Sequence, residues 1–305
     1  AVTVDGSLAI LGLADGTVLQ RIHAHEGGVG GAFFCDAVAA DVRHAETLIS
    51  IGDDGRLILH DIGDASARTV LQLSNAPLRC VTMHPTRPLV AVGHADRRVS
   101  VWNIALKTLQ GEVSVSSVTG DWRTNPMAQV RGICFEGSSN LLRTSLVNDY
   151  LHTIEVGDDG VTRISGKIND GRFGGPLAFD AATSSFIAAD YSFGYLSKVS
   201  GEQLQPLMLS RGAEAHRNRV TAVAVHPRGE LALSASQDGN LLAWDMNAAE
   251  LRLSMRFDAA LLDACFRGDG ASILVSCFDG SIRSVPLDPL AVARDYIARR
   301  RQRME

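Results

Sequence analysis

The sequence predicts an all-β chain built from seven similar four-stranded units. Short runs of aliphatic and β-branched residues alternate with turn residues along nearly its whole length. A tight-turn dipeptide returns at near-constant intervals, with steps of 39, 42, 53, 44, 45 and 41 residues and a mean of 44. About 40–45 residues is the length of one four-stranded repeat unit, so seven turns predict seven units.

The clearest unit lies between His216 and Asp245. Residues 220–225, 231–236 and 241–245 are apolar runs of strand length. The last two runs are separated by Asp238-Gly239, a dipeptide that favours a tight hairpin because glycine tolerates positive φ without steric cost. These features predict three consecutive antiparallel strands.

This unit closely resembles one WD40 repeat, the unit of a β-propeller. The resemblance is strongest in the second, third and sixth units, and it implies a seven-bladed WD40 β-propeller. The turns between the second and third strands of the blades are Asp15-Gly16, Asp54-Gly55, Asp96-Arg97, Asp149-Tyr150, Phe193-Gly194, Asp238-Gly239 and Asp279-Gly280. The expected blades lie near residues 1–24, 29–73, 78–113, 130–168, 176–209, 220–255 and 261–287.

The first and last blades leave the closure of the propeller open. Blade one is expected to begin with its innermost strand at residues 1–4, followed by strands at 8–13 and 17–20. Blade seven ends after its third strand, near residue 287. Either an upstream segment supplies its outer strand, or the sheet edge is open and can accept a strand from a partner.

Residues 289–305 predict a short C-terminal α-helix. Asp288-Pro289 is a favourable helix start, and Leu290, Ala293 and Ile297 share one face at helical spacing. The tail is basic, and the arginines of interest in it are Arg299, Arg300 and Arg301. They are candidate contacts for RNA or an acidic partner, because clustered arginine attracts phosphate. In the alternative, the helix packs its apolar face under blade seven and leaves the arginines in solvent.

Bulk composition limits the function classes. A chain of 305 residues with a net charge of -5 does not favour nucleic-acid binding over its whole surface. The five cysteines are not closely spaced and lie in apolar runs, which predicts small buried core residues in a reducing compartment. No apolar run approaches the roughly 18–20 residues of a membrane span, and we expect a cytoplasmic protein.

The resemblance also implies a hydrogen-bonded network inside each blade, formed by a His, a Ser or Thr, the turn Asp and a Trp. Blade six matches at all four places, and blades two and three match in part. The residues assigned to this network are His216, Ser236, Asp238 and Trp244 in blade six, His25 and Asp54 in blade two, and Asp96 and Trp102 in blade three. A hydrolase triad is the alternative reading of His, Ser and Asp, but a buried brace inside a strand lacks an oxyanion hole.

Two further histidines recur at one position of the repeat. His84-Pro85 and His226-Pro227 both follow the innermost strand of a blade. We interpret them as repeat turn chemistry and not as metal ligands or catalytic residues. No metal site or cofactor is expected.

Candidate partner-binding residues lie in the loops that lead into the inner strands and in one hairpin. They are the arginines Arg79, Arg97, Arg98, Arg131, Arg217 and Arg219. In WD40 propellers these loops share one face, so converging arginines could bind an acidic peptide or a phosphate. Solvated arginines at the rim are the alternative. Trp122, in an insertion near residues 116–129, is a further candidate contact because tryptophan is a frequent interface anchor.

These observations favour a non-catalytic scaffold for protein–protein interaction, as a subunit of a larger assembly. The resemblance supports this function by analogy, because a fold does not fix a function. An RNA-associated subunit of a ribonucleoprotein, using the basic tail, is the main alternative. An enzymatic propeller is the third, and it would need acidic residues or histidines that converge on the central channel.

Overall fold

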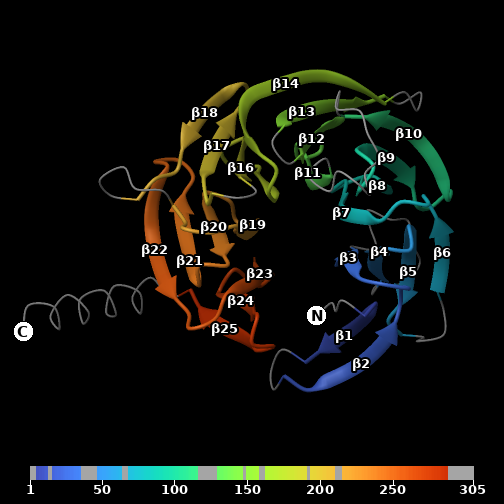
Figure 1. The fold of residues 1–305 in the computed structure, drawn as a ribbon, viewed down its shortest axis with the longest axis horizontal. Coiled ribbons are helices and arrows are strands. Elements are labelled where there is room, and N and C mark those ends of the chain that lie inside the picture. The colour runs from blue at the N-terminus through green and yellow to red at the C-terminus, as the bar shows by residue number, and fades with distance from the viewer. Residues whose placement is uncertain are drawn as a thin grey trace, which may run out of the picture. The chain divides into compact units, whose positions relative to one another are not determined.

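The computed structural model of the chain describes residues 5–12, 16–35, 47–63, 68–115, 129–146, 149–157, 162–190, 193–209 and 215–287. Every regular element in these ranges is a β-strand, and they contain no helix (Figure 1). The chain divides into two compact units, Ala1–Gly174 and Gly175–Glu305. The predicted all-β class is therefore confirmed.

The first unit holds β1 to β14 in one two-stranded and three four-stranded antiparallel sheets. The two-stranded sheet is β1 (Ser7–Leu11) and β2 (Val18–His23). Blade two is β3 (Val29–Cys35), β4 (Thr47–Gly52), β5 (Arg56–Asp61) and β6 (Arg68–Gln72). Blade three is β7 (Leu78–Met83), β8 (Leu89–His94), β9 (Arg98–Asn103) and β10 (Thr108–Ser114). Blade four is β11 (Val130–Phe135), β12 (Leu141–Leu146), β13 (Asp149–Val156) and β14 (Thr162–Phe173).

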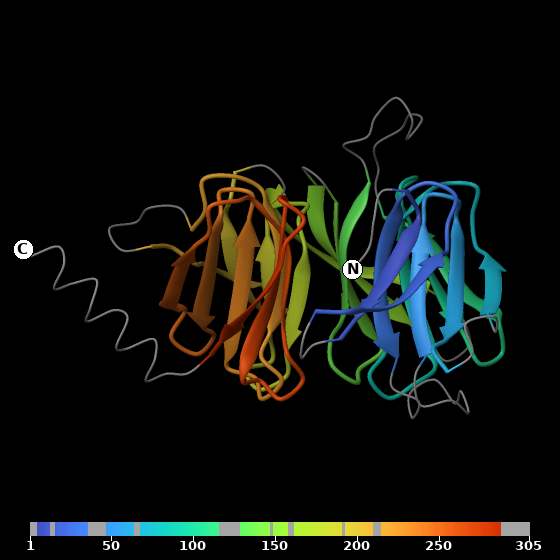
Figure 2. The same ribbon diagram turned by 90° about the horizontal axis from the view of Figure 1, so that it is seen from below.

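The second unit holds three blades, each ordered as a meander. Blade five is β15 (Leu177–Asp180), β16 (Ser185–Ala189), β17 (Leu196–Ser200) and β18 (Gln203–Pro206). Blade six is β19 (Val220–Val225), β20 (Leu231–Ser236), β21 (Asn240–Asp245) and β22 (Glu250–Arg256). Blade seven is β23 (Leu261–Phe266), β24 (Ser272–Cys277) and β25 (Ile282–Pro286). Within the unit, successive blades stand next to one another, from yellow to red in Figure 2.

The described residues thus form six propeller blades, not the seven that we predicted. Five blades have four strands, and blade seven has three. The predicted blade one is represented by the two strands β1 and β2 alone, and its predicted strand at residues 1–4 lies outside the described ranges.

The turn at the start of β1 shows which strands of a blade this small sheet contains. Asp5 accepts a hydrogen bond from the backbone N–H of Ser7 at 3.0 Å. In blade two, Asp54 accepts the same bond from Arg56 at 3.1 Å, in the turn between the second and third strands. β1 and β2 therefore correspond to the third and fourth strands of a blade, and not to the inner strands that we predicted.

The glycine of this turn supports the same assignment. The carbonyl of Gly6 accepts a hydrogen bond from the N–H of His25 at 3.1 Å, as that of Gly55 does from Ser74 at 3.2 Å. A Cβ at Gly6 would lie 1.9 Å from the His25 carbonyl oxygen, so only glycine fits. The predicted turn Asp15-Gly16 was wrong, because Gly16 lies in the connection between β1 and β2. An Asp-Gly dipeptide suits either turn equally well, and the spacing in the sequence did not distinguish Asp5-Gly6 from Asp15-Gly16.

Blade four departs from its predicted strands. Asp149-Tyr150, which we predicted as its tight turn, forms the first two residues of β13. β14 continues beyond the predicted end at residue 168 to Phe173, which pairs with Asp149. The pairing of Asp149 with Phe173 therefore places both of these residues in the sheet, and no tight turn forms at Asp149.

The hydrophobic core of each unit lies between neighbouring blades. In the first unit, Ile49 and Leu57 of blade two pack with Leu78 of blade three. In the second unit, Leu233 of blade six packs with Leu261 of blade seven. Within its unit, blade three and blade six are each covered on both faces by neighbouring blades, which is why their central strands read as continuous apolar runs.

Burial falls from the central strands to the outer ones. All six residues of β4 and of β8 are buried. The outer strand β22 instead alternates exposed and half-buried side chains, because only one of its faces contacts the core. The blades therefore leave their outer strands and their turns as the accessible surface of each unit.

The five cysteines are free, and they do not all lie in the core as we predicted. Cys35 and Cys277 are buried, Cys80 and Cys134 are half-buried, and Cys265 is exposed. Cys265 is exposed because side chains alternate along β23: Ala264 and Phe266 pack on the core, so Cys265 points to the other face.

The predicted C-terminal helix at residues 289–305 lies outside the described ranges. Among the residues that are described, no helix is long and apolar enough to cross a membrane.

Candidate functional site

A buried chain of hydrogen bonds runs through blade six. His216 precedes β19, and its Nδ1 lies 3.4 and 3.3 Å from Oδ1 and Oδ2 of Asp238. Its Nε2 lies 2.8 Å from the hydroxyl of Ser234. The indole N–H of Trp244 donates to the same hydroxyl at 3.0 Å. We call these four residues the blade-six brace.

The donors and acceptors of the brace fix its protonation. The Asp238 carboxylate only accepts, so the proton of the neutral His216 ring is on Nδ1. Nε2 of His216 then accepts from the Ser234 hydroxyl, and the oxygen of Ser234 accepts from Trp244. With this tautomer, the ring nitrogens of His216, the hydroxyl of Ser234 and the indole N–H of Trp244 all have partners inside the blade.

Asp238 also holds the backbone of the turn. Its carboxylate accepts the N–H of Arg217 at 2.8 Å and that of Asn240 at 2.9 Å. Burial alone would raise the pKa of Asp238, but the hydrogen bonds from His216 and from these two N–H groups hold that pKa well below its usual value. The turn and the loop before β19 are thus joined through one carboxylate.

The serine of the brace is Ser234 and not Ser236, which we predicted from the sequence. Ser236 instead donates to the carbonyl of Asn218 at 3.1 Å and accepts the N–H of Asp238 at 3.1 Å. Both serines lie in β20 two residues apart, so strand alternation places them on the same face. The signal that identifies Ser234 is its place four residues before the turn aspartate, which Ser50 shares in blade two.

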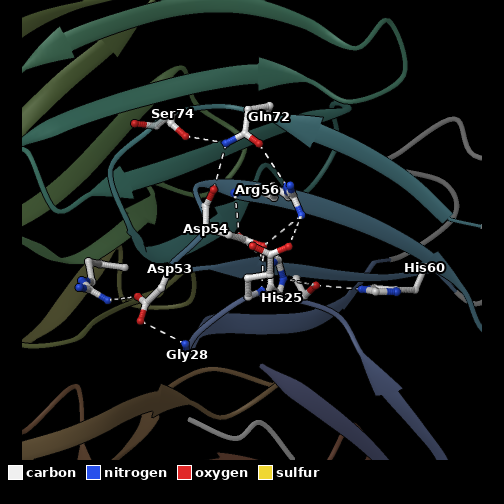
Figure 3. Close-up of polar contacts among 11 residues, drawn as sticks. His25, Gly28, Asp53, Asp54, Arg56, His60, Gln72 and Ser74 are labelled. Atoms are coloured by element: carbon white, nitrogen blue, oxygen red, sulfur yellow. Dashed lines mark hydrogen bonds and ion pairs between the residues drawn. The ribbon is translucent and has the colours of Figure 1, made fainter. Parts of the chain in front are cut away.

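Blade two holds a second brace with one replacement (Figure 3). His25 Nδ1 lies 2.9 Å from Asp54, and His25 Nε2 lies 2.8 Å from the hydroxyl of Ser50. The second partner of this hydroxyl is His60 Nε2 at 2.9 Å, where blade six has tryptophan. Since Ser50 donates to His25, Nε2 of His60 must carry a proton and donate.

His60 and Gly52 complete the description of the blade-two brace. Burial, with the neighbouring His25 and Arg68, lowers the pKa of His60 from 6.5 to about 4. The His25 ring lies directly over Gly52, where a Cβ would come 2.4 Å from its Cγ. The brace therefore places His25 and a neutral His60 on one hydroxyl and requires glycine beside His25.

Blade three connects the same residue types differently. His94, which lies in β8 itself, contacts the hydroxyl of Ser100 at 2.7 Å, and the indole N–H of Trp102 donates to that hydroxyl at 3.0 Å. Asp96 contacts Arg98 and not a histidine. Burial lowers the pKa of His94 to about 4 against the opposing charge of Asp96. Nδ1 of His94 is buried and has no hydrogen-bond partner within the described ranges.

The Ser, His and Asp inside a blade are the residue types of a hydrolase triad, but their burial and contacts differ from those of a catalytic triad. Ser234 and His216 are 0% and 1% exposed, and Ser50 and His25 are 0% and 1% exposed. The serine hydroxyl already donates to histidine and accepts from a third side chain inside the blade. A substrate carbonyl could not reach the serine oxygen without unfolding the blade, so the geometry supports a brace.

His84 and His226 join neighbouring blades. His226 accepts the N–H of Arg228 on Nδ1 at 3.1 Å, so its Nε2 carries the proton and donates to the carbonyl of Gly270 in blade seven at 3.1 Å. His84 makes the matching bond from blade three to the carbonyl of Ser139 before β12, at 3.2 Å. These contacts agree with the structural interpretation of the two His-Pro turns.

Two candidate arginines of the first unit are already paired. Arg79 forms an ion pair with Asp53 and donates to Gln129 at 2.9 Å, so it joins three blades. Arg98 contacts Asp96 and Glu112, both at 2.7 Å. The hydrogen bond to Asp96 is the main cause that raises the pKa of the Arg98 guanidinium.

The other two candidates of the first unit are half-buried. Arg97 occupies the glycine position of the blade-three turn and has a φ of 73°, in the left-handed region. Arg131 lies near the start of β11, next to the buried thiol of Cys80. Burial raises the pKa of that thiol to about 12, although the charge of Arg131 opposes the shift.

The second unit presents a different surface at its turns. Arg217 is exposed, and no carboxylate of the described residues forms an ion pair with its side chain. Arg219 is half-buried at the start of β19. Two phenylalanines of this unit were not among the candidate contacts from the sequence: Phe193 is 64% exposed and Phe278 is 76% exposed. Both occupy a turn between second and third strands, a position that could have identified them.

The remaining candidates lie outside the described ranges. They are Trp122 in the predicted insertion and Arg299, Arg300 and Arg301 in the predicted tail. Among the described residues, no three side chains of His, Cys, Asp or Glu gather in a group that could hold a metal ion.

Comparison with known proteins gives one family. The model of the WD domain, G-beta repeat (WD40) matches residues 68–103 and 209–245. The first match spans β6 to β9, and the second spans β19 to β21 with the whole blade-six brace. No curated protein matches the sequence. The chain therefore carries WD40 repeats in both units, consistent with the WD40-repeat family and with its propeller blades.

Proposed function

We propose that this WD40-repeat chain is a non-catalytic scaffold for protein–protein interaction and a subunit of a larger assembly. β-Propellers with such repeats are generally interaction scaffolds. A scaffold function is expected from the fold alone, and a fold does not determine a function, so the residues of this chain must support it.

The observation that carries the proposal is the division between buried polar and exposed apolar side chains. The residues with catalytic chemistry, such as His216 and Ser234, are buried in braces and contact one another. The turns of the second unit instead expose large aromatic side chains, Phe193 and Phe278. Exposed aromatic side chains on a rigid framework favour protein contact over chemistry.

Association with RNA through residues 289–305 is the alternative from the sequence. Its arginines lie outside the described ranges, and no contact within those ranges favours it. The experiment below separates the two functions.

The test is affinity purification of the tagged full chain beside a version that ends at residue 288, each with and without ribonuclease. We expect a stoichiometric set of proteins, identified by mass spectrometry, with both versions and after ribonuclease. Loss of the set on truncation or on ribonuclease treatment would favour the RNA-associated function. Recovery of no stoichiometric protein would contradict the scaffold.

A further inference from the structure

We propose that one edge of the second unit binds an acidic peptide segment of a partner protein. This edge, which we call the turn edge, is formed by residues 193–195, 215–219, 237–240, 257–260 and 278–281, which lie in turns between second and third strands and in loops between blades. The segment places a carboxylate on Arg217 and apolar side chains on Phe193 and Phe278. The inference rests on the proposed scaffold function and names the chemistry of its partner.

Backbone hydrogen bonds connect the turn edge from one blade to the next. The N–H of His216 donates to the carbonyl of Gly194, next to Phe193, at 3.2 Å. The N–H of Arg217 donates to the turn aspartate of blade six. The N–H of Phe278 in blade seven donates to the carbonyl of Ala260, in the loop that follows blade six, at 2.8 Å. The two phenylalanines and the arginine between them therefore belong to one continuous row.

The aromatic side chains of the turn edge face solvent on fixed turns. Phe193 lies 6.2 Å from Tyr195 between ring centroids, and its N–H is held by the carboxylate of Asp190. Phe278 follows the buried Cys277 directly. Rigid aromatic side chains lose little conformational entropy when a partner covers them, so they are effective anchors.

The charges of the turn edge favour a carboxylate as the polar contact. The carboxylate of Asp238 is occupied by His216 and backbone N–H groups, and Asp279 contacts Arg283 at 3.4 Å. Arg217 has no acidic partner among the described residues, and its guanidinium can bind a carboxylate through two parallel hydrogen bonds. The row therefore carries a positive charge at Arg217 between two exposed aromatic side chains, and the exposed carboxylates of Asp258 and Asp279 lie toward its Phe278 end.

The same surface fits a nucleic acid poorly. A nucleic-acid strand carries a charge at every phosphate and needs a continuous cationic stripe. On the turn edge the exposed carboxylates of Asp258 and Asp279 interrupt the arginines. A peptide with few acidic residues among apolar ones matches this alternation better than a polyanion does.

The test is a selection of random phage-displayed peptides on the full chain, followed by affinity measurement with fluorescein-labelled synthetic copies. We expect the selected peptides to combine Glu or Asp with aliphatic or aromatic residues. Arg217→Glu, Phe193→Ser and Phe278→Ser should each weaken their binding by about tenfold or more. All three substitutions keep the backbone bonds of the turn edge, and thermal melting verifies that the variants fold.

Matched controls come from the same chain. Arg228→Glu changes another exposed arginine of blade six, in the turn between its first and second strands, at the opposite end of β20. Leu106→Ser removes an apolar side chain that is 69% exposed in the first unit. Both controls should leave binding unchanged. Replacing the acidic residue of a selected peptide by Lys should restore its binding to Arg217→Glu.

Three outcomes would overturn the inference: selection of no acidic peptide, equal binding by Arg217→Glu and the wild-type chain, or displacement of the peptide by oligo(U) RNA. Such a failure is distinct from failure of the scaffold. If stoichiometric partners still co-purify with the full chain, only the assignment of the turn edge is wrong.

Discussion

In the first unit, Arg79 and Arg98 contact carboxylates of neighbouring strands or blades, whereas in the second unit Arg217 contacts none among the described residues. All three arginines have similar places in the repeat, in or beside the turns and inter-blade loops. Pairing, and not position in the repeat, therefore distinguishes an arginine that stabilises a blade from one that is available to a partner.

Both units nevertheless share the same internal brace. His25 and Ser50 in blade two have the same contacts as His216 and Ser234 in blade six. The two braces differ in the third ring, which is His60 in one and Trp244 in the other. The comparison thus separates a framework that both units share from features of one unit, and four predictions test it.

The largest expected effect is on the shared brace. Ser234→Ala leaves the Nε2 of His216 and the indole N–H of Trp244 without a partner inside the blade. We expect it to lower the free energy of unfolding by about 3 kcal/mol, as the sum of two buried unsatisfied groups. Urea denaturation measures the change. Ser236→Ala is the control, and it should cost about 1 kcal/mol or less because its contacts are at the turn.

The same substitution in blade two, Ser50→Ala, should be similarly costly, since it separates His25 from His60. If Ser236→Ala proved as costly as Ser234→Ala, the assignment of the serine would be wrong. If Ser50→Ala were neutral, the two units would not share the brace.

The next prediction uses pH to distinguish His60 of blade two from Trp244 of blade six, because only the histidine can bind a proton. The pKa of His60 is about 4 in the folded chain and 6.5 in the unfolded chain, so below pH 6.5 the unfolded state binds the extra proton. Stability is therefore lost as pH falls from 6.5 toward 4, by about 2 kcal/mol at pH 5 from this residue. His60→Gln keeps an N–H for Ser50 and should reduce the pH dependence of the urea midpoint. An unchanged pH dependence would contradict this origin.

The third effect concerns the arginines directly. Arg98→Ala removes the partner of Asp96 and should lower the free energy of unfolding by about 1–2 kcal/mol, because the ion pair is partly exposed. Arg217→Ala should change it by less than about 0.5 kcal/mol, as is usual for an exposed side chain without partners. Thermal melting of the two variants compares them. Equal losses would remove the distinction between a structural and an available arginine.

The smallest effect concerns a turn. Gly239 occupies the left-handed position of the blade-six turn with a φ of 82°, whereas blade three has Arg97 there with a φ of 73°. Arg97→Gly should raise stability by up to about 1 kcal/mol by relieving this conformation. A fall in the melting temperature would mean that contacts of the Arg97 side chain outweigh the backbone strain.

The sequence was sufficient to predict the strands of the blades with clear periodicity, because the alternation of apolar runs and turns indicates where each strand begins and ends. The innermost strand of blade six was predicted at residues 220–225, where the structure has β19. Asp238 and Trp244, which were assigned to the network from the sequence, contact His216 and Ser234 respectively. The strands of blades two, three and six therefore needed no tertiary information.

Errors arose where two positions have the same local chemistry. Asp5-Gly6 and Asp15-Gly16 are equally good hairpin turns, and only the hydrogen bonds to the loop at His25 distinguish them. Ser234 and Ser236 share a strand face, and the reach of His216 decides between them. The exposure of Phe193 depends on which neighbours cover a turn, and this information lies outside the local sequence.

The two His-Pro turns have a consequence for how the protein opens. His226 ties blade six to blade seven through Gly270, and His84 ties blade three to blade four through Ser139. In a repeat array, where each repeat contacts only its neighbours, such ties make adjacent repeats open together. The amide hydrogens of blades six and seven should therefore exchange with solvent as one cooperative group, so the smallest unit of fluctuation is a pair of blades.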